Sequence, residues 1–302
     1  MVPRAETGAS VATVDLSGRT ALVTGATSGI GREIALALGR LGARVLAHGR
    51  DRDRGRAVVD ALAAGGSPAP SFFPADFEDQ SAVEALAAWT LDEAEAVDLL
   101  VHNAGTHRRR GRLNAAGIER TVAVNHLAPF VLTRRLLGGF PADGRIVVVA
   151  SKSHRQVDLD LRTFTDVSGY DGSEAYARSK LANVLFVRAL ARRLDGPTAN
   201  ALHPGFVPGT AIGRDAPWYS RAVVWALAQV PRVVPTRYIE RPATGAETAV
   251  FLAASPTVAD VTGAYFVDCE PVPPAPIATD DALAAALWRE SERLTGVDWP
   301  AS

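Results

Sequence analysis

The feature that most constrains the fold is a glycine-rich segment between two apolar runs of different periodicity. Thr20–Thr24 predicts a buried strand, Gly25–Gly31 follows with the spacing G-x-x-x-G-x-G, and a helical pattern extends from Arg32 to about Leu41. A second strand is predicted over Ala43–His48. In such a unit the glycines allow a sharp turn and let the backbone approach a pyrophosphate at the helix N-terminus. The segment therefore predicts a dinucleotide site; the alternative is a glycine-rich turn without a ligand.

Strand and helix patterns alternate along the rest of the chain. Further strands are predicted over 71–74, 98–102, 144–150, 200–203 and 264–267, and helices over 81–96, 118–137, 176–194, 244–253 and 280–294. Near-continuous β-branched strands such as 144–150 are typical of parallel sheets that are covered on both faces. We predict an α/β fold with a single Rossmann domain, in which a doubly wound parallel sheet of about seven strands carries helices on both faces.

The domain organisation is predicted to be simple. Residues 18–270 form the Rossmann-fold dinucleotide-binding and catalytic domain, and the polar, irregular segment 152–175 is not expected to be a core element. Residues 206–240 combine aromatic and aliphatic side chains with prolines, which predicts a substrate lid or, alternatively, a segment packed on the domain or on a partner subunit. A proline-rich connector begins at 271, so residues 271–302 are predicted to be a C-terminal extension with a terminal helix.

Composition excludes several classes of protein. A net charge near −1 over 302 residues argues against a nucleic-acid partner. The single Cys269 excludes an intrachain disulfide framework and fits a reducing compartment. The first 17 residues lack a signal-peptide pattern, and no apolar run approaches the roughly 20 residues that cross a bilayer. We expect a cytoplasmic protein without a membrane span.

Tyr176 and Lys180 are candidates for proton transfer. They lie four residues apart in a predicted helix and therefore share a face. A tyrosine hydroxyl has an ordinary pKa near ~10, and an ammonium one turn away would lower that pKa. The chain has 32 lysine and arginine residues, yet lysine occurs only at 152 and 180. Arginine replaces such a lysine poorly because its planar fork differs in shape and hydrogen bonding. The alternative is a solvated surface lysine.

The end of the second predicted strand bears on the choice of cofactor. An NAD site needs a carboxylate there for the ribose 2′-OH, whereas an NADP site needs an arginine for the 2′-phosphate. Gly49 stands at the expected carboxylate position and Arg50 follows it, so NADP(H) is preferred and NAD(H) is the alternative. Asp51 could bind the ribose, but Asp51 or Asp53 equally suits an N-cap for the next helix.

Six motifs occur in a fixed order along the chain. They are Thr24–Gly31, Asn103-Ala104-Gly105, Asn125, Ser151, Tyr176-x-x-x-Lys180 and Pro204-Gly205. The ordered set resembles the short-chain dehydrogenase/reductase family over roughly residues 18 to 268. Residues 124–130, 176–183 and 263–269 are similar to its retinol-dehydrogenase-like branch. One departure is Ala150, where many relatives have the first serine of a pair.

A more distant resemblance concerns the loop 204–210, which is similar to that of light-dependent protochlorophyllide reductases. Those proteins carry a functional cysteine near this loop, whereas Phe206 follows Pro204-Gly205 here and the only cysteine is Cys269. We therefore set that activity aside.

The resemblance implies a catalytic set of Asn125, Ser151, Tyr176 and Lys180. Tyr176 would exchange a proton with the substrate oxygen, and Ser151 would hydrogen-bond the same oxygen as charge develops on it. Lys180 would lower the pKa of Tyr176 and hold the nicotinamide ribose. Asn125 would position a water that links Lys180 to solvent, or it is simply a hydrogen-bonded core amide.

The resemblance also implies a cofactor site around the glycine loop. Glycines 25, 29 and 31 would line the pyrophosphate, Arg50 the 2′-phosphate, Asp76 the adenine and Asn103 the adjacent ribose. The full expected set is Gly25, Thr27, Ser28, Gly29, Ile30, Gly31, Arg50, Asp76, Phe77, Asn103, Ala104, Gly105, Tyr176, Lys180, Pro204, Gly205 and Thr210. No metal ligand is expected.

The implied function is an NADP-dependent oxidoreductase that interconverts a carbonyl and an alcohol on a bulky, apolar small molecule. One alternative is a tailoring ketoreductase of specialised metabolism. Another, from a different class, is a nucleotide-binding sensor or scaffold; such a chain should have lost the serine, tyrosine or lysine, whereas this one keeps all four catalytic positions. We expect a homodimer or homotetramer.

Overall fold

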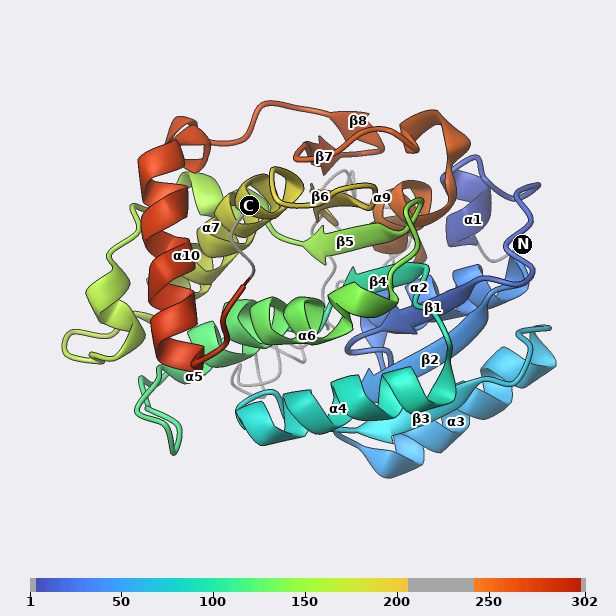
Figure 1. The fold of residues 1–302 in the computed structure, drawn as a ribbon, viewed down its shortest axis with the longest axis horizontal. Coiled ribbons are helices and arrows are strands. Elements are labelled where there is room, and N and C mark those ends of the chain that lie inside the picture. Colours follow the sequence, from blue (N-terminus) through green and yellow to red (C-terminus); the bar gives the residue numbers. More distant parts are fainter. Residues whose placement is uncertain (1–3, 206–241, 300–302) are drawn as a thin grey trace, which may run out of the picture.

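Eight strands form one sheet in the computed structural model, which describes residues 4–205 and 242–299 (Figure 1). The strands are β1 (Thr20–Val23), β2 (Arg44–Gly49), β3 (Ser71–Pro74), β4 (Leu99–His102), β5 (Arg145–Val149), β6 (Thr198–His203), β7 (Tyr265–Val267) and β8 (Glu270–Pro271). Their order across the sheet is β3-β2-β1-β4-β5-β6-β7-β8. Strands β1 to β7 are parallel, and β8 pairs antiparallel with β7. The predicted Rossmann sheet of about seven parallel strands is confirmed, with β8 as an added edge.

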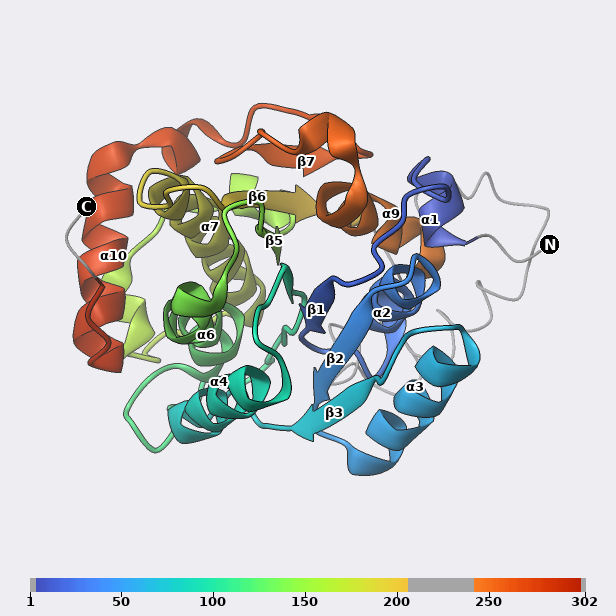
Figure 2. The same cartoon turned by 45° about the vertical axis from the view of Figure 1, so that its right-hand side comes forward.

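Helices cover both faces of this sheet. The principal ones are α2 (Gly29–Arg40), α3 (Arg52–Ala64), α4 (Gln80–Glu93), α6 (Ala128–Leu136), α7 (Gly172–Ala191), α9 (Pro242–Ala254) and α10 (Asp281–Thr295). Helices α2, α3 and α9 lie on one face, whereas α4, α6 and α7 lie on the other with α10 outside them (Figure 2). Aspartate side chains cap the N-termini of α3, α4, α7 and α10 by accepting backbone N–H bonds. Asp51 is the cap of α3, which confirms the N-cap interpretation of that residue.

Two apolar cores result, one on each face of the sheet. On the α2 face, Ile34 and Leu38 are fully buried one helical turn apart. On the other face an aromatic cluster joins α6, α7 and α10, in which the ring of Trp288 lies 5.1 Å from that of Phe130 and 5.8 Å from that of Phe186. Because these rings bury large apolar areas, the terminal helix belongs to the core of the domain.

The helix expected over 118–137 is interrupted. It begins as α5 (Arg120–Val122), passes through a π-helical turn, η1 (Ala123–Leu127), and continues as α6. Pro129 has no N–H to donate to the carbonyl of Asn125 four residues earlier, so regular α-helical bonding cannot continue there. The sequence pattern missed this turn, which contains Asn125.

The segment 152–175 contributes to the core, contrary to the sequence-based expectation. It contains two 3-10 turns, η3 (Lys152–Arg155) and η4 (Leu161–Phe164), and both His154 and Phe164 are fully buried. Such isolated anchors have no periodicity, which explains why the pattern missed them. A short N-terminal helix, α1 (Ala5–Gly8), was also not predicted.

Two expectations concern the organisation of the domain. The boundary expected between residues 270 and 271 falls within β8. The expected lid at 206–240, including Thr210, lies outside the described residues.

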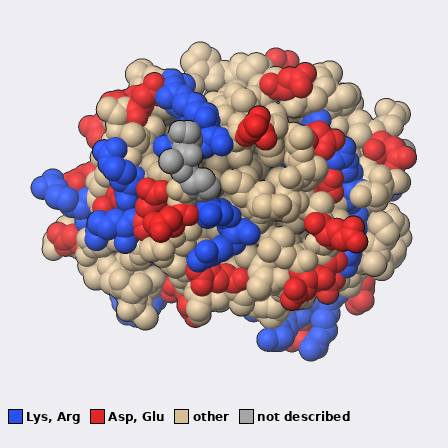
Figure 3. Space-filling view, in the orientation of Figure 1, with Lys and Arg blue, Asp and Glu red and all other residues tan. Residues whose placement is uncertain are grey.

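No described helix is both long and apolar enough to cross a membrane. On the face seen in Figure 3, acidic and basic side chains are interspersed.

Buried histidines predict how stability depends on pH. Burial lowers the pKa of His102 and His126 from 6.5 to about 3. Because the unfolded chain then binds protons that the folded chain cannot, stability is fully present above pH 6.5 and is lost as the pH falls. We expect each histidine to remove about 2 kcal/mol of unfolding free energy between pH 7 and pH 5. Denaturant titrations at both pH values measure this loss, and His102→Gln should reduce it; a protein more stable at pH 5 would contradict the assignment.

Candidate functional site

The glycine loop is held against the end of β4. Gly25 and Gly29 have φ angles of 68° and 57°, in the left-handed region that favours glycine. The Asn103 side chain donates from Nδ2 to the carbonyl oxygens of Thr24 at 2.9 Å and Gly25 at 3.3 Å. A Cβ on Gly31 would lie 2.2 Å from Asn103 Nδ2 and 2.4 Å from the Gly25 oxygen, so only glycine fits. The loop, α2 and β4 therefore meet where the sheet order reverses between β1 and β4.

A cavity of about 290 Å³ opens along these strand ends. Its lining includes most of the expected cofactor set: Gly25, Thr27, Ser28, Gly29, Ile30, Gly31, Arg50, Asp76, Phe77, Asn103, Ala104, Gly105, Tyr176, Lys180 and Pro204. Gly205 follows Pro204 with a φ angle of 76° but does not line the cavity. Residues separated by up to 179 positions in sequence thus share one surface because parallel strands end at the same edge of the sheet.

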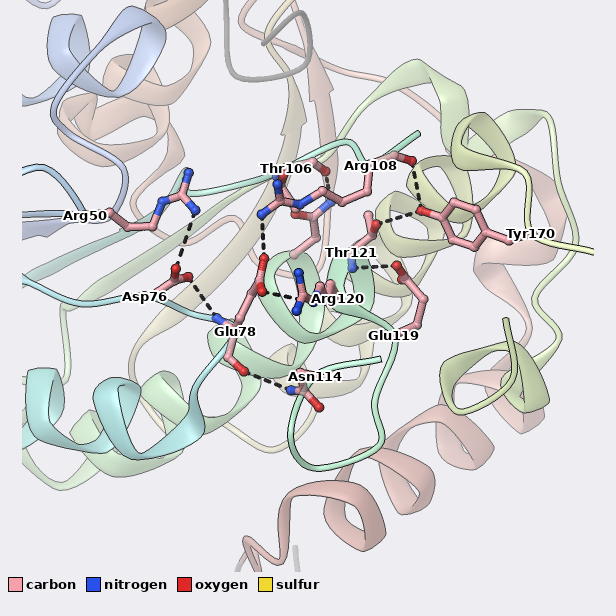
Figure 4. A network of polar contacts seen from close by, with 11 residues as sticks. Arg50, Asp76, Glu78, Thr106, Arg108, Asn114, Glu119, Arg120, Thr121 and Tyr170 are labelled. Carbon is pink, nitrogen blue, oxygen red and sulfur yellow. Dashed lines mark hydrogen bonds and ion pairs between the residues drawn. The ribbon is translucent and has the colours of Figure 1, made fainter. Parts of the chain in front are cut away.

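Arg50 and Asp76 face each other at one end of the cavity. Their side chains are about half exposed, and Arg50 Nη1 lies 3.5 Å from Asp76 Oδ2. Asp76 also accepts the backbone N–H of Glu78, and the Glu78 carboxylate in turn binds Arg108 and Arg120 (Figure 4). A half-exposed ion pair is weak, so Arg50 is available to a second anion.

Tyr176 lies on α7 at the opposite end of the cavity. Burial raises the pKa of its hydroxyl to about 12, and a hydrogen bond with the Ser151 side chain opposes that shift. This direction differs from the expectation that Lys180 lowers the pKa. Lys180 Nζ lies 5.7 Å from the centre of the tyrosine ring. At that distance its effect on the pKa of Tyr176 is smaller than the effect of removing the hydroxyl from water.

Lys180 is almost wholly buried behind Tyr176. Its Nζ donates to the Val149 carbonyl at 2.7 Å, at the end of β5, and burial lowers the pKa of this ammonium to about 8. The group therefore remains mostly protonated at neutral pH. The interpretation as a solvated surface lysine is wrong.

Asn125 is also fully buried, beside the cavity wall. Its Nδ2 donates to the Thr106 oxygen and to Ser179 Oγ, both at 2.9 Å, and its Oδ1 accepts the Thr106 N–H at 2.7 Å. These contacts are those of a hydrogen-bonded core amide, the alternative noted from the sequence. They fix the backbone after Gly105, and the expected water-positioning role stays a prediction.

Several residues that line the cavity were not predicted from the sequence. They are His48, Arg54, Ala75, Thr106, Arg108, Val124, Val149 and Ala150. Arg54 lies about one helical turn after Asp51 and Thr106 directly follows the Asn103–Gly105 motif, so position beside a recognised motif was a usable signal. His48 directly precedes Gly49-Arg50 and had the same signal, although an inward-facing histidine on a strand also resembles any core residue.

The residues present fit a nicotinamide dinucleotide. The glycine loop offers a turn in which added Cβ atoms at Gly25 and Gly31 would collide with backbone or Asn103, leaving main chain exposed to the cavity. Arg50 supplies positive charge at one end, and Tyr176 with Lys180 supplies proton-bearing groups at the other. Within residues 4–205 and 242–299, no group of three metal-ligating side chains is arranged to hold a metal ion.

Fold and site together define a dinucleotide-binding protein of the Rossmann type, and comparison with known proteins gives the family. Residues 19–217 match the short chain dehydrogenase family. The chain is 37% identical over 300 residues to retinol dehydrogenase 14 of Homo sapiens, covering 93% of this chain and 88% of that protein. It is also 37% identical to a candidate daunorubicin C-13 ketoreductase of Streptomyces sp. (strain C5), covering 93% and 94% respectively.

Solved structures agree. An uncharacterized protein of Mycobacterium Paratuberculosis superposes with a TM-score of 0.75 at 28% identity, covering 95% of this chain and 97% of that one. A short chain dehydrogenase of Burkholderia cenocepacia J2315 in complex with NADP gives 0.66 at 28% identity, with 83% and 96% covered. This chain belongs to the short-chain dehydrogenase family, in its retinol-dehydrogenase-like branch, and is an NAD(P)-dependent oxidoreductase.

The close contact at Gly31 yields a prediction. Gly31→Ala should force Asn103 and the Gly25 carbonyl apart and weaken binding of NADP⁺ by ~10-fold or more, because the contact with backbone cannot relax cheaply. Quenching of tryptophan fluorescence on titration with NADP⁺ measures the affinity. Gly138→Ala is the matched control, since a Cβ there meets nothing within 4 Å. Equal affinities of the two variants would disprove the role of this contact.

Proposed function

We propose that this protein is an NADP-dependent carbonyl reductase and alcohol dehydrogenase in which Tyr176 is the acid and base. The observation that carries the proposal is the placement of Tyr176, beside the Ser151 side chain and with Lys180 Nζ 5.7 Å from its ring centre, in the wall of the dinucleotide cavity. The nicotinamide ring supplies or accepts the hydride when the cofactor is bound.

The described residues handle the proton and the developing charge. In reduction, Tyr176 donates its proton to the substrate oxygen, and the Ser151 hydroxyl hydrogen-bonds the same oxygen as negative charge develops on it. Burial keeps the proton on Tyr176 at neutral pH, which is the form that reduction requires. The Lys180 ammonium then stabilises the resulting phenolate, so the proton is transferred without an unpaired buried anion.

The preference for NADP rests on Arg50 and Gly49. A Cβ at residue 49 would lie 2.4 Å from Thr27 Cγ2, so a carboxylate side chain for an unmodified ribose has no room there. Arg50 stands half-exposed at the same end of the cavity, in the right place to meet a 2′-phosphate. The Burkholderia relative was solved with NADP, which supports this choice.

The substrate is proposed to be a bulky, apolar small molecule. This proposal is supported by the names of relatives, which include retinol dehydrogenases of Homo sapiens and a polyprenol dehydrogenase of Mus musculus. The candidate ketoreductase from Streptomyces supports the second function, a tailoring ketoreductase of specialised metabolism. A spectrophotometric screen of retinoid, polyprenyl and polycyclic aromatic carbonyls with NADPH and NADH separates the two. The cytoplasmic location and the homodimer or homotetramer stay predictions.

Substitution of the tyrosine tests the chemistry. Tyr176→Phe should lower turnover by ~10²-fold or more while leaving the affinity for NADP⁺ nearly unchanged, because only the proton donor is removed. Lys180→Arg should also turn over poorly, since the guanidinium does not reproduce the ammonium contact with Val149. Tyr265→Phe is the control, because its hydroxyl has no hydrogen-bond partner among the described residues and Tyr265 does not line the cavity. Near-normal turnover of Tyr176→Phe would refute the mechanism.

Substitution of the arginine tests cofactor choice. A charge-assisted contact with a 2′-phosphate is worth ~1.5–3 kcal/mol, so Arg50→Ala should weaken NADPH roughly tenfold to a hundredfold and leave NADH little changed. Arg56→Ala, which removes an exposed arginine of α3 paired with Asp53, should change neither affinity. If the unmutated protein binds both cofactors equally, the NADP assignment is wrong.

A further inference from the structure

His48 is a buried imidazole in the wall of the cofactor cavity to which the mechanism assigns no role. It is the second-last residue of β2, and its exposed fraction is 2%. Its side chain lies between the glycine loop after β1 and the residues that follow β3. These are the two segments that enclose the adenosine end of the cavity together with Arg50.

Two hydrogen bonds determine the chemical form of this imidazole. The Gly25 N–H donates to Nδ1 at 3.3 Å, and Nε2 lies 3.1 Å from the Ala75 carbonyl oxygen. A backbone N–H can only donate and a carbonyl can only accept, so Nδ1 is the acceptor and Nε2 carries the proton. The ring is therefore neutral, with both nitrogens satisfied.

The face of the His48 ring makes a third contact, with Phe77. His48 and Phe77 stack with centroids 4.2 Å apart and planes within 8° of parallel. Phe77 lines the cavity and is itself buried. One side chain thus fixes the Gly25 turn, the Ala75 backbone and the Phe77 ring relative to one another.

Protonation would break this arrangement. An imidazolium cannot accept the Gly25 N–H, because both of its nitrogens donate. Burial lowers the pKa of His48 to about 4; of the charged groups that face it, Asp76 raises the pKa and Arg50 lowers it. The neutral form therefore persists throughout the neutral range.

We propose that His48 is a positioning residue for the cofactor: by bridging Gly25, Ala75 and Phe77 it holds the adenosine–pyrophosphate half of the site in its binding geometry. This role rests on the dinucleotide site proposed above. It deepens that proposal by assigning part of the cofactor affinity to a side chain whose two ring nitrogens both bond the protein backbone.

The test compares three variants in titrations with NADP⁺, followed by fluorescence quenching. His48→Phe keeps an aromatic ring but loses both hydrogen bonds, and we expect its Kd to rise ~10-fold or more. His48→Asn keeps an acceptor near the Nδ1 position and should recover part of the loss. Ser67→Ala is the matched control: its hydroxyl bridges Val45 N and Ala43 O beside the opposite end of β2, so the variant loses two hydrogen bonds away from the cavity. Its Kd should equal that of the unmutated protein.

Steady-state kinetics supply an independent readout. His48→Phe should raise the KM for the cofactor more than it lowers kcat. If His48→Phe does not fold, comparison of the Kd values of His48→Asn and Ser67→Ala decides the question. An unchanged Kd in the His48 variants overturns the role of His48, whereas failure of the unmutated protein to bind either cofactor overturns the dinucleotide site itself.

Discussion

The contact on which the site depends is the Asn103 carboxamide against the glycine loop. The sheet order reverses between β1 and β4, so the segments that leave these two strands diverge and open a crevice at their C-terminal ends. Asn103 spans the base of that crevice by bonding the Thr24 and Gly25 carbonyls, while the missing Cβ of Gly31 lets α2 begin directly against it. Because of this close approach, the backbone of the glycine loop and the N-terminus of α2 are exposed to the cavity.

The end of the cavity that holds Tyr176 and Lys180 is shaped by burial more than by charge. Lys180 is anchored to the end of β5 through the Val149 carbonyl, and α7, which carries both it and Tyr176, is fixed from outside by the rings of α10. Removal from water raises the pKa of the tyrosine and lowers that of the lysine, so a neutral hydroxyl stands beside an ammonium. That pairing supports donation of a proton to a carbonyl oxygen.

Buried polar side chains link the strand ends that carry the site. Asn125 ties the π-helical turn to the backbone at Thr106, and His48 ties the glycine loop to the residues after β3. Both side chains make hydrogen bonds to backbone groups, which is how buried polar atoms avoid a desolvation cost. Such links hold loops that have little apolar area of their own, and they explain how irregular segments form a defined wall.

The sequence alone determined the alternation of strands and helices, the glycine loop and the ordered family motifs, because periodicity and local turn chemistry are properties of neighbouring residues. Only the tertiary structure decided the contacts made across the sheet. The hydrogen bonds of Asn125, the burial of His154 and Phe164, the raised pKa of Tyr176 and the bridge made by His48 all depend on partners far away in the chain. Burial and hydrogen-bond partners are set by packing, and no local pattern of residues encodes them.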